Sequence, residues 1–305
     1  MKTYAKNTAL LADAIDVLQV EQPCTLRQLY YRLISRGSIP NAQAAYQRLG
    51  KLMTRAREKG LISRRWLVDH TRASLKPSSW SGLGDFADTV RDAYRKDFWS
   101  SLDHHVEVFV EKDAVAGTIQ PVTNSYDIAL RVCRGYASVS FSGEIADEWR
   151  SITKPIFAYY LGDFDPSGFD IERDLREKLE RYSGRAVYEN DSNPSRHQVS
   201  WQRLGVIDTD FNDHDLIRLP IKVKDVRAKG FREAHGDSGA EIDAIPPSEL
   251  RRRVREAIEQ HIESERWERL RHVEELERET MRQALSSLGS DEKESRFGFE
   301  SEVVE

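Results

Sequence analysis

Two aspartates spaced two residues apart, Asp163 and Asp165, follow an apolar run of strand character at residues 156–161. Side chains two residues apart on a strand point to the same face, so these carboxylates are expected to converge at its carboxyl end. Converging carboxylates repel unless a cation lies between them, and hard oxygen ligands favour Mg²⁺ or Mn²⁺. Gly168 allows close backbone approach, and a helix pattern starts at Phe169. A capped strand-to-helix turn without a metal fits the same residues.

A third acid, Glu111, ends another strand-like run at residues 106–111. Between residues 106 and 182 strand and helix patterns alternate, which predicts an α/β fold with a parallel sheet flanked by helices. Adjacent central strands would bring Glu111 to the aspartate pair and complete a site of three carboxylates. The alternative for Glu111 is a favourable charge at the N-terminus of the next helix.

Two adjacent tyrosines, Tyr30 and Tyr31, lie on a short helix pattern near the N-terminus. The pattern covers residues 25–36, with Thr25 as a plausible N-cap. Tyr30 falls among the apolar side chains, whereas Tyr31 falls on another side next to Arg27 and is predicted to be free to meet solvent or a ligand. A tyrosine hydroxyl titrates near pH 10, so it needs a group such as Arg27 to stabilise the phenolate. An exposed tyrosine beside an arginine is also a common surface arrangement.

Basic residues are concentrated near the N-terminus of a chain whose formal net charge is −5. Residues 24–79 hold twelve basic and two acidic residues, which is typical of a phosphate-binding surface. Four of the basic residues recur every three or four positions on a helix pattern at 42–59 and could follow a DNA groove, unless they form only a solvated face. The predicted DNA contacts are Arg32, Arg36, Arg48, Lys51, Arg55 and Lys59.

These motifs together resemble a known family. The runs VEVFVEKDA and YYLGDFDPSGFDI resemble the Toprim fold of topoisomerases, bacterial primases and some nucleases. The Asp-Pro-x-Gly continuation and the Arg-x-Leu-Tyr-Tyr motif resemble the A subunit of topoisomerase VI and its meiotic double-strand-break relatives, here in a short bacterial or phage-like form. The resemblance extends over residues 25–260.

The resemblance implies a winged-helix DNA-binding domain followed by a Toprim-like domain, and Mg²⁺-dependent cleavage of double-stranded DNA. Tyr31 would be the nucleophile that forms a 5′-phosphotyrosyl link, and Arg27 would steady the phosphate. Glu111, Asp163 and Asp165 would bind Mg²⁺ or Mn²⁺. A homodimer is implied, with the tyrosine of one protomer over the metal of the other, and a separate B-type subunit would supply any ATPase activity. Two alternatives stay open: a Toprim nuclease that uses water as its nucleophile, and a non-catalytic DNA-binding protein.

Breakers in the sequence predict the domain limits. We expect a winged-helix module at 1–75, a linker with a connecting helix at 76–104, the Toprim-like domain with a helical extension at 105–285, and a disordered acidic tail at 286–305. The extension is expected to be one long helix at 248–284.

The remaining residues suggest a setting but little further chemistry. Two distant cysteines, Cys24 and Cys133, suggest a reduced, cytoplasmic setting, and no segment of membrane-spanning length is apparent. The DNA-cleaving activity implied by the resemblance adds the expectation that the protein is associated with the nucleoid. Glu241 and Asp243 have no evident chemical role; they could approach the metal site, but capping the following helix is the simpler expectation.

Overall fold

The computed structural model describes residues 2–68, 78–221, 225 and 227–298, with side chains from residue 7 to residue 285. It divides the chain into two compact units. The first comprises residues 1–72 and 103–260, and the second comprises residues 73–102 and 261–305. The motifs that carry chemistry all belong to the first unit.

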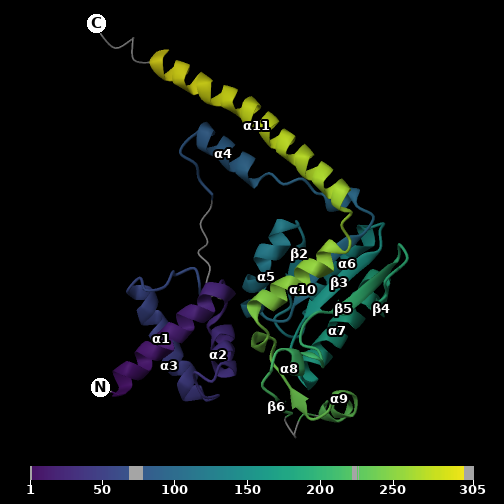
Figure 1. Cartoon of the computed structure of the whole chain (residues 1–305). Helices are drawn as coiled ribbons and strands as arrows, with labels where there is room; N and C mark the ends of the chain where they lie inside the picture. The colour runs from purple at the N-terminus through teal and green to yellow at the C-terminus, as the bar shows by residue number, and fades with distance from the viewer. Residues whose placement is uncertain (1, 69–77, 222–224, 226, 299–305) are drawn as a thin grey trace. The chain divides into compact units, whose positions relative to one another are not determined.

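A parallel sheet of five strands forms the centre of the first unit (Figure 1). Its strand order is β2-β1-β3-β5-β4, so β1 and β3 are central neighbours as predicted. Their register pairs Val110 of β1 with Leu161 of β3, which places the residues after both strands at one edge of the sheet. The strands are β1 (His105–Val110), β2 (Ala129–Val132), β3 (Ile156–Leu161), β4 (Ala186–Glu189) and β5 (Gln198–Arg203).

Helices pack on this sheet because its side chains alternate between two apolar faces. On one face, Phe109, Tyr160 and Trp201 pack with Trp149 of α6 and Leu175 of α7 in a buried cluster. The other helix pair, α5 and α10, packs together, and Gln260 just past α10 donates a 2.6 Å hydrogen bond to the Tyr159 hydroxyl. The helices are α5 (Asp113–Ser125), α6 (Val139–Ser151), α7 (Pro166–Ser183) and α10 (Pro247–Glu259). Helices therefore flank the parallel sheet that contains β1 and β3, which confirms the predicted α/β architecture.

Three helices precede the sheet: α1 (Lys2–Glu21), α2 (Leu26–Ser35) and α3 (Gln43–Glu58). Thr25 caps α2 as predicted, because its side chain accepts from the Gln28 amide and the Gln28 side chain accepts from the Thr25 amide. After α3, Leu67 forms a single bridge with Cys24. The wing that a winged-helix module at 1–75 would have after α3 is not found among the residues described up to Val68, and residues 69–77 lie outside the described part of the chain.

Short elements connect β5 to α10: α8 (Asp210–Asp213), β6 (Leu219–Pro220), α9 (Ala228–His235), β7 (Ser238–Gly239) and the 3₁₀ helix η2 (Ile242–Ala244). The second unit contains α4 (Leu83–Ala93), the 3₁₀ helix η1 (Trp99–Ser101) and α11 (Ser264–Gly298), and Trp267 of α11 packs edge-on against Phe98.

The prediction of one long helix at 248–284 is wrong, because the helix is interrupted between the end of α10 at Glu259 and the start of α11 at Ser264. Leu250, Val254 and Ile258 are buried within the first unit. Helix α11 continues to Gly298, through most of the segment predicted to be a disordered tail. Among the described residues, no helix is both long and apolar enough to span a membrane.

Candidate functional site

Glu111 and Asp163 lie side by side where β1 and β3 end. The Glu111 amide donates to the Leu161 carbonyl at 2.9 Å, which continues the ladder between the strands. Two residues after the end of β3, the Asp163 amide donates to Glu111 Oε2 at 3.0 Å. Parallel pairing of two central strands thus brings together two carboxylates that are 52 residues apart in the sequence.

Asp165 has a different environment from Asp163. Strand β3 ends at Leu161, so the alternation used to predict a shared direction does not extend to these residues. Asp165 is the N-cap of α7, and its Oδ1 accepts from the Gly168 amide at 2.7 Å. In the described part of the chain, no three His, Cys, Asp or Glu side chains are grouped so that they could hold a metal ion. The three-carboxylate ligand set therefore stays a prediction.

Glycines allow tight packing in the loop after β3. A Cβ atom on Gly168 would lie 2.4 Å from the backbone oxygen of Asp163, and one on Gly162 would lie 2.9 Å from Glu111 Oε2. Such separations are shorter than real Cβ contacts, so both positions require glycine as long as this loop is retained. The close approach expected at Gly168 is confirmed.

The electrostatics of Glu111 reflect crowding by negative charge. Its pKa is raised to about 7, mainly by burial and also by the nearby carboxylates of Asp163 and Asp165, against the hydrogen bond from the Asp163 amide and the charge of Lys112. A cation close to these oxygens would favour the ionised form of Glu111 and relieve the repulsion.

Asp163 is held by partners from two elements. Lys112, the residue after Glu111, places its Nζ 2.6 Å from Asp163 Oδ2. The Ile242 amide of η2 donates to Asp163 Oδ1 at 2.9 Å. These contacts connect the end of β3 to the segment at residues 241–243, which the sequence analysis left without a chemical role.

Glu241 and Asp243 face this site and do not cap the following helix, α10. The N-cap of α10 is Pro246, and no side chain caps it, so the capping expectation is wrong. Glu241 forms an ion pair with Arg27 of α2. Asp243 is 1% exposed, and its Oδ2 lies 3.7 Å from Lys112 Nζ and 3.9 Å from Arg27 Nε.

Tyr31 is buried, which corrects the prediction that it would be free to meet solvent. It is 7% exposed, nearly the same as Tyr30, because α2 packs against η2 on the side that carries Arg27. Burial raises the pKa of the Tyr31 hydroxyl and the charge of Glu241 adds to this, while the hydrogen bond from Arg27 opposes it. The predicted proximity of Arg27 and Tyr31 is therefore present, with the Tyr31 ring buried and the Arg27 side chain still 47% exposed.

The charged residues of the site thus form one connected network. It runs from Tyr31 and Arg27 through Glu241 and Asp243 to Lys112, and continues through Asp163 to Glu111. Carboxylate oxygens of this kind fit a hard divalent cation. Asp243 strengthens that fit, because neither of its oxygens accepts a hydrogen bond from the described residues.

Sequence reasoning missed Lys112, and it preferred a capping role for Glu241 and Asp243 over the approach to the metal site that it also considered. One signal was present, since Asp243 lies in the otherwise apolar stretch Ile242–Ile245 and an acid in such a stretch is often buried for a reason. Nothing in the local pattern indicated that residues 241–243 contact α2, more than 200 positions earlier.

The predicted DNA-contact residues are mostly on the surface. Arg48, Lys51, Arg55 and Lys59 are exposed along α3, as the stripe requires. Arg48 donates to the Asn7 side chain of α1 at 2.7 Å and 3.0 Å. Arg36 is exposed, whereas Arg32 is half-buried and burial lowers its pKa.

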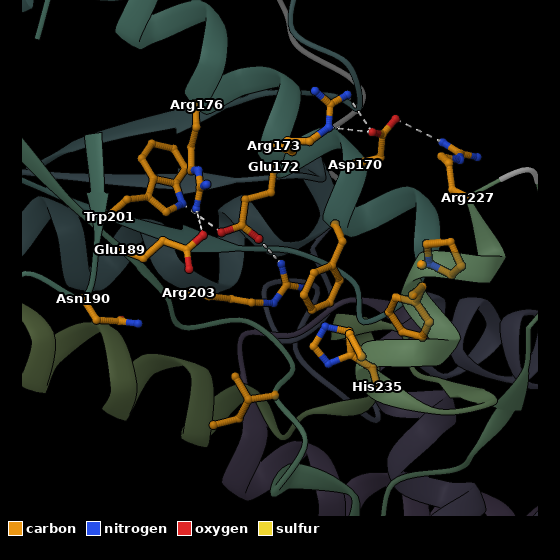
Figure 2. A pocket seen from close by; sticks show the side chains of 16 residues that line it. Asp170, Glu172, Arg173, Arg176, Glu189, Asn190, Trp201, Arg203, Arg227 and His235 are labelled. Carbon is orange, nitrogen blue, oxygen red and sulfur yellow. Dashed lines mark hydrogen bonds and ion pairs between the residues drawn. The ribbon is translucent and has the colours of Figure 1, made fainter. Parts of the chain in front are cut away.

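A separate cavity of about 630 Å³ lies beside α7, β5 and α9 (Figure 2). Its wall includes four arginines, each of which is ion-paired: Arg173, Arg176, Arg203 and Arg227. Arg203 points to Glu172, which also accepts from the Trp201 indole at 2.8 Å. Arg203 further donates to the backbone carbonyls of Gly162 and Asp163, so the cavity wall supports the loop that carries the candidate site.

We compared the chain with known protein families and with curated proteins. No family model matches this chain, and no curated protein matches it either.

Proposed function

We propose that this chain cleaves DNA by tyrosine transesterification, as a short relative of the A subunit of topoisomerase VI. In this proposal α1–α3 serve as a winged-helix module and the parallel sheet serves as a Toprim-like domain. The observation that supports it best is the network that joins Tyr31 and Arg27 to Asp163 and Glu111 within one chain. A nucleophile and phosphate-stabilising groups must meet at a single phosphorus, and this network brings both kinds of group together.

In the proposed reaction the Tyr31 hydroxyl loses its proton and its oxygen attacks a backbone phosphorus. The bond from phosphorus to the 3′ oxygen breaks, the 3′ oxygen takes up a proton, and the 5′ phosphate stays on the tyrosine. Glu111, Asp163 and Asp165 would hold Mg²⁺ or Mn²⁺, which would stabilise charge on the phosphate and on the leaving oxygen. The basic stripe of α3 would position the duplex through its phosphates.

Two features define what must change before Tyr31 can react. The Tyr31 ring is buried and the pKa of its hydroxyl is raised, so a phosphate can reach the hydroxyl only after the contact between α2 and η2 opens. Arg27 is paired with Glu241, and a DNA phosphate would have to replace that carboxylate. The structure therefore corresponds to a closed state in this proposal. The network within one chain supports a reaction of Tyr31 at its own acidic site once that contact opens. The homodimer implied by the resemblance, in which Tyr31 would instead reach the partner's acidic site, and a separate ATPase subunit stay predictions.

The same burial favours a second candidate, a metal-dependent nuclease in which water attacks the phosphorus. In that case Tyr31 would be a packing residue at the junction of α2 and η2, and the basic helices would only hold the DNA. The acidic residues would keep the roles given above.

Trapping of covalent adducts on supercoiled plasmid, with Mg²⁺ or Mn²⁺, tests the proposal. Denaturant-quenched reactions of the wild-type chain are expected to contain protein-linked DNA, and Tyr31→Phe should abolish both the adduct and the cut. Tyr188→Phe is the matched control, because Tyr188 is 47% exposed on the edge strand β4 and should leave both unchanged. Cutting by Tyr31→Phe without linked protein would establish the nuclease instead. DNA binding that needs no metal, without cutting and unchanged by Asp163→Ala, would indicate a non-catalytic protein.

A variant with the opposite expected effect sharpens this test. Glu241→Gln removes the charge that pairs with Arg27 and contributes to the raised pKa of Tyr31. It should increase adduct yield if the Arg27–Glu241 pair holds the closed state. An unchanged or lower yield would show that this pair does not restrain Tyr31.

A further inference from the structure

Asp243 has an unusual environment for a buried carboxylate. Its side chain is 1% exposed, and neither oxygen accepts a hydrogen bond from the described residues. The nearest cationic atoms, on Lys112 and Arg27, lie 3.7 Å and 3.9 Å from Oδ2, beyond hydrogen-bond distance. Burying a charged group that has no hydrogen bond and no close ionic partner is costly. Among the described residues, the Asp243 carboxylate therefore has neither a hydrogen-bond donor nor a cation in direct contact.

Lys112 lies between Asp243 and a second carboxylate. Its Nζ is 2.6 Å from Asp163 Oδ2 and 3.7 Å from Asp243 Oδ2. The two acids come from separate elements, the loop after β3 and the 3₁₀ helix η2, so the ammonium group bridges them as a bound cation would. The Lys112 side chain is 28% exposed and its stem is flexible, so the ammonium group can move toward solvent without unfolding of the sheet.

The chemistry of this position suits a divalent ion better than an ammonium group. Mg²⁺ in proteins is commonly held by one or two carboxylates while it keeps several water ligands. Two converging carboxylates, one of them deeply buried and without a hydrogen bond, supply that kind of donor set. An ammonium group carries half the charge and stays at a long distance from Asp243.

We propose that Asp163 and Asp243 form a divalent-cation site in which the Lys112 ammonium group stands in until Mg²⁺ or Mn²⁺ displaces it. This inference depends on the proposed function only through Asp163, which is a ligand in both. It adds Asp243, which no motif assigned, and it gives Lys112 the role of a competitor for the metal.

Binding of Mn²⁺ alone to the full chain, without DNA, tests the inference. Titration followed by electron paramagnetic resonance of free Mn²⁺ would measure affinity and stoichiometry. Asp243→Asn should weaken binding about tenfold or more, since even groups that only orient metal ligands change affinity by that amount. Lys112→Met should strengthen binding, because the competing charge is gone. Glu177→Gln is the matched control, since it removes an exposed carboxylate of α7 and should change nothing.

The double variant Lys112→Met/Asp243→Asn makes the test decisive. The gain from Lys112→Met should disappear in it if the gain arises at Asp243. The inference is overturned if Asp243→Asn binds Mn²⁺ like the wild type, if Lys112→Met weakens binding, if the gain survives in the double variant, or if neither the wild type nor Lys112→Met binds Mn²⁺. A binding cycle with the expected signs supports the inference even if plasmid cleavage is never seen, so failure of the proposed function can be distinguished from failure of this site.

Discussion

Two carboxylates of the first unit are equally buried and have opposite surroundings. Asp210 and Asp243 are each 1% exposed. Asp210 Oδ2 accepts from the Ile207 amide at 2.9 Å and from Arg253 at 3.0 Å, and its other oxygen also pairs with Arg253. Asp243 accepts no hydrogen bond from the described residues, and its nearest cations are beyond bonding distance.

The same contrast appears in the ionisation of two glutamates. Burial works against ionisation of Glu249, but Arg252 and Arg253 outweigh it and lower its pKa to about 2. Glu111 lacks such compensation, and its pKa is raised to about 7. This fold can therefore satisfy a buried acid completely where the acid serves structure. The incompletely satisfied acids gather at the ends of β1 and β3, where we propose that another ion and a substrate must enter.

The largest expected effect is the loss of the Asp210 pair. Asp210→Asn should lower the free energy of unfolding by about 3–5 kcal/mol, because it leaves Arg253 short of its buried partner. Asp243→Asn should change it by less than about 0.5 kcal/mol or increase it, because no hydrogen bond is lost and a buried charge is removed. Urea unfolding in the presence of a chelator measures both. Equal losses for the two variants would remove the distinction between these regions.

Glu111→Gln should stabilise the metal-free protein at alkaline pH. The pKa of Glu111 is raised in the folded state, so the folded chain binds its proton more tightly than the unfolded chain does. Stability of the wild type must then fall as pH rises from about 4.5 through about 7. The variant carries no such charge and should be more stable by up to about 3 kcal/mol at pH 8, with little difference at pH 4. Urea midpoints at the two pH values, with a chelator, test this, and a gain that is independent of pH would contradict it.

How far could the sequence predict this molecule? Apolar runs and turn residues correctly indicated β1, β3 and the cap of α2, because those features depend on neighbours in the chain. The adjacency of β1 and β3 followed from the alternation of strands and helices. These predictions placed Glu111 and Asp163 together without any knowledge of the structure.

Contacts between distant segments could not be predicted in this way. The burial of Tyr31 depends on η2, which lies more than 200 residues further along the chain and covers that face of α2. Helical periodicity shows which side of a helix is less apolar, but not whether another segment packs there. The bridging position of Lys112 depends on the same packing.

Glu249→Gln should have the opposite pH dependence from Glu111→Gln and a smaller effect. The lowered pKa of Glu249 means that its ionised form stabilises the folded state above about pH 4.5, and this contribution is lost as pH falls toward about 2. At pH 7 the variant should lose about 1–2 kcal/mol, since solvent near Arg252 weakens part of the interaction. Urea unfolding at pH 7 and pH 3 should show the loss shrinking at the lower pH. A loss of equal size at both values would mean that packing, and not charge, accounts for it.

The smallest expected effect concerns Arg203, which connects the two kinds of region. It satisfies the buried Glu172 and also donates to the carbonyls of Gly162 and Asp163. Arg203→Lys keeps the charge beside Glu172 but cannot bond in several directions at once, so stability should fall by only about 1 kcal/mol. The substitution should affect the candidate site more than it affects stability. The backbone of Asp163 loses a hydrogen bond from Arg203, so the affinity for Mn²⁺ should drop. If stability falls while Mn²⁺ binding is untouched, the satisfied region does not position the reactive one, and the two regions are independent.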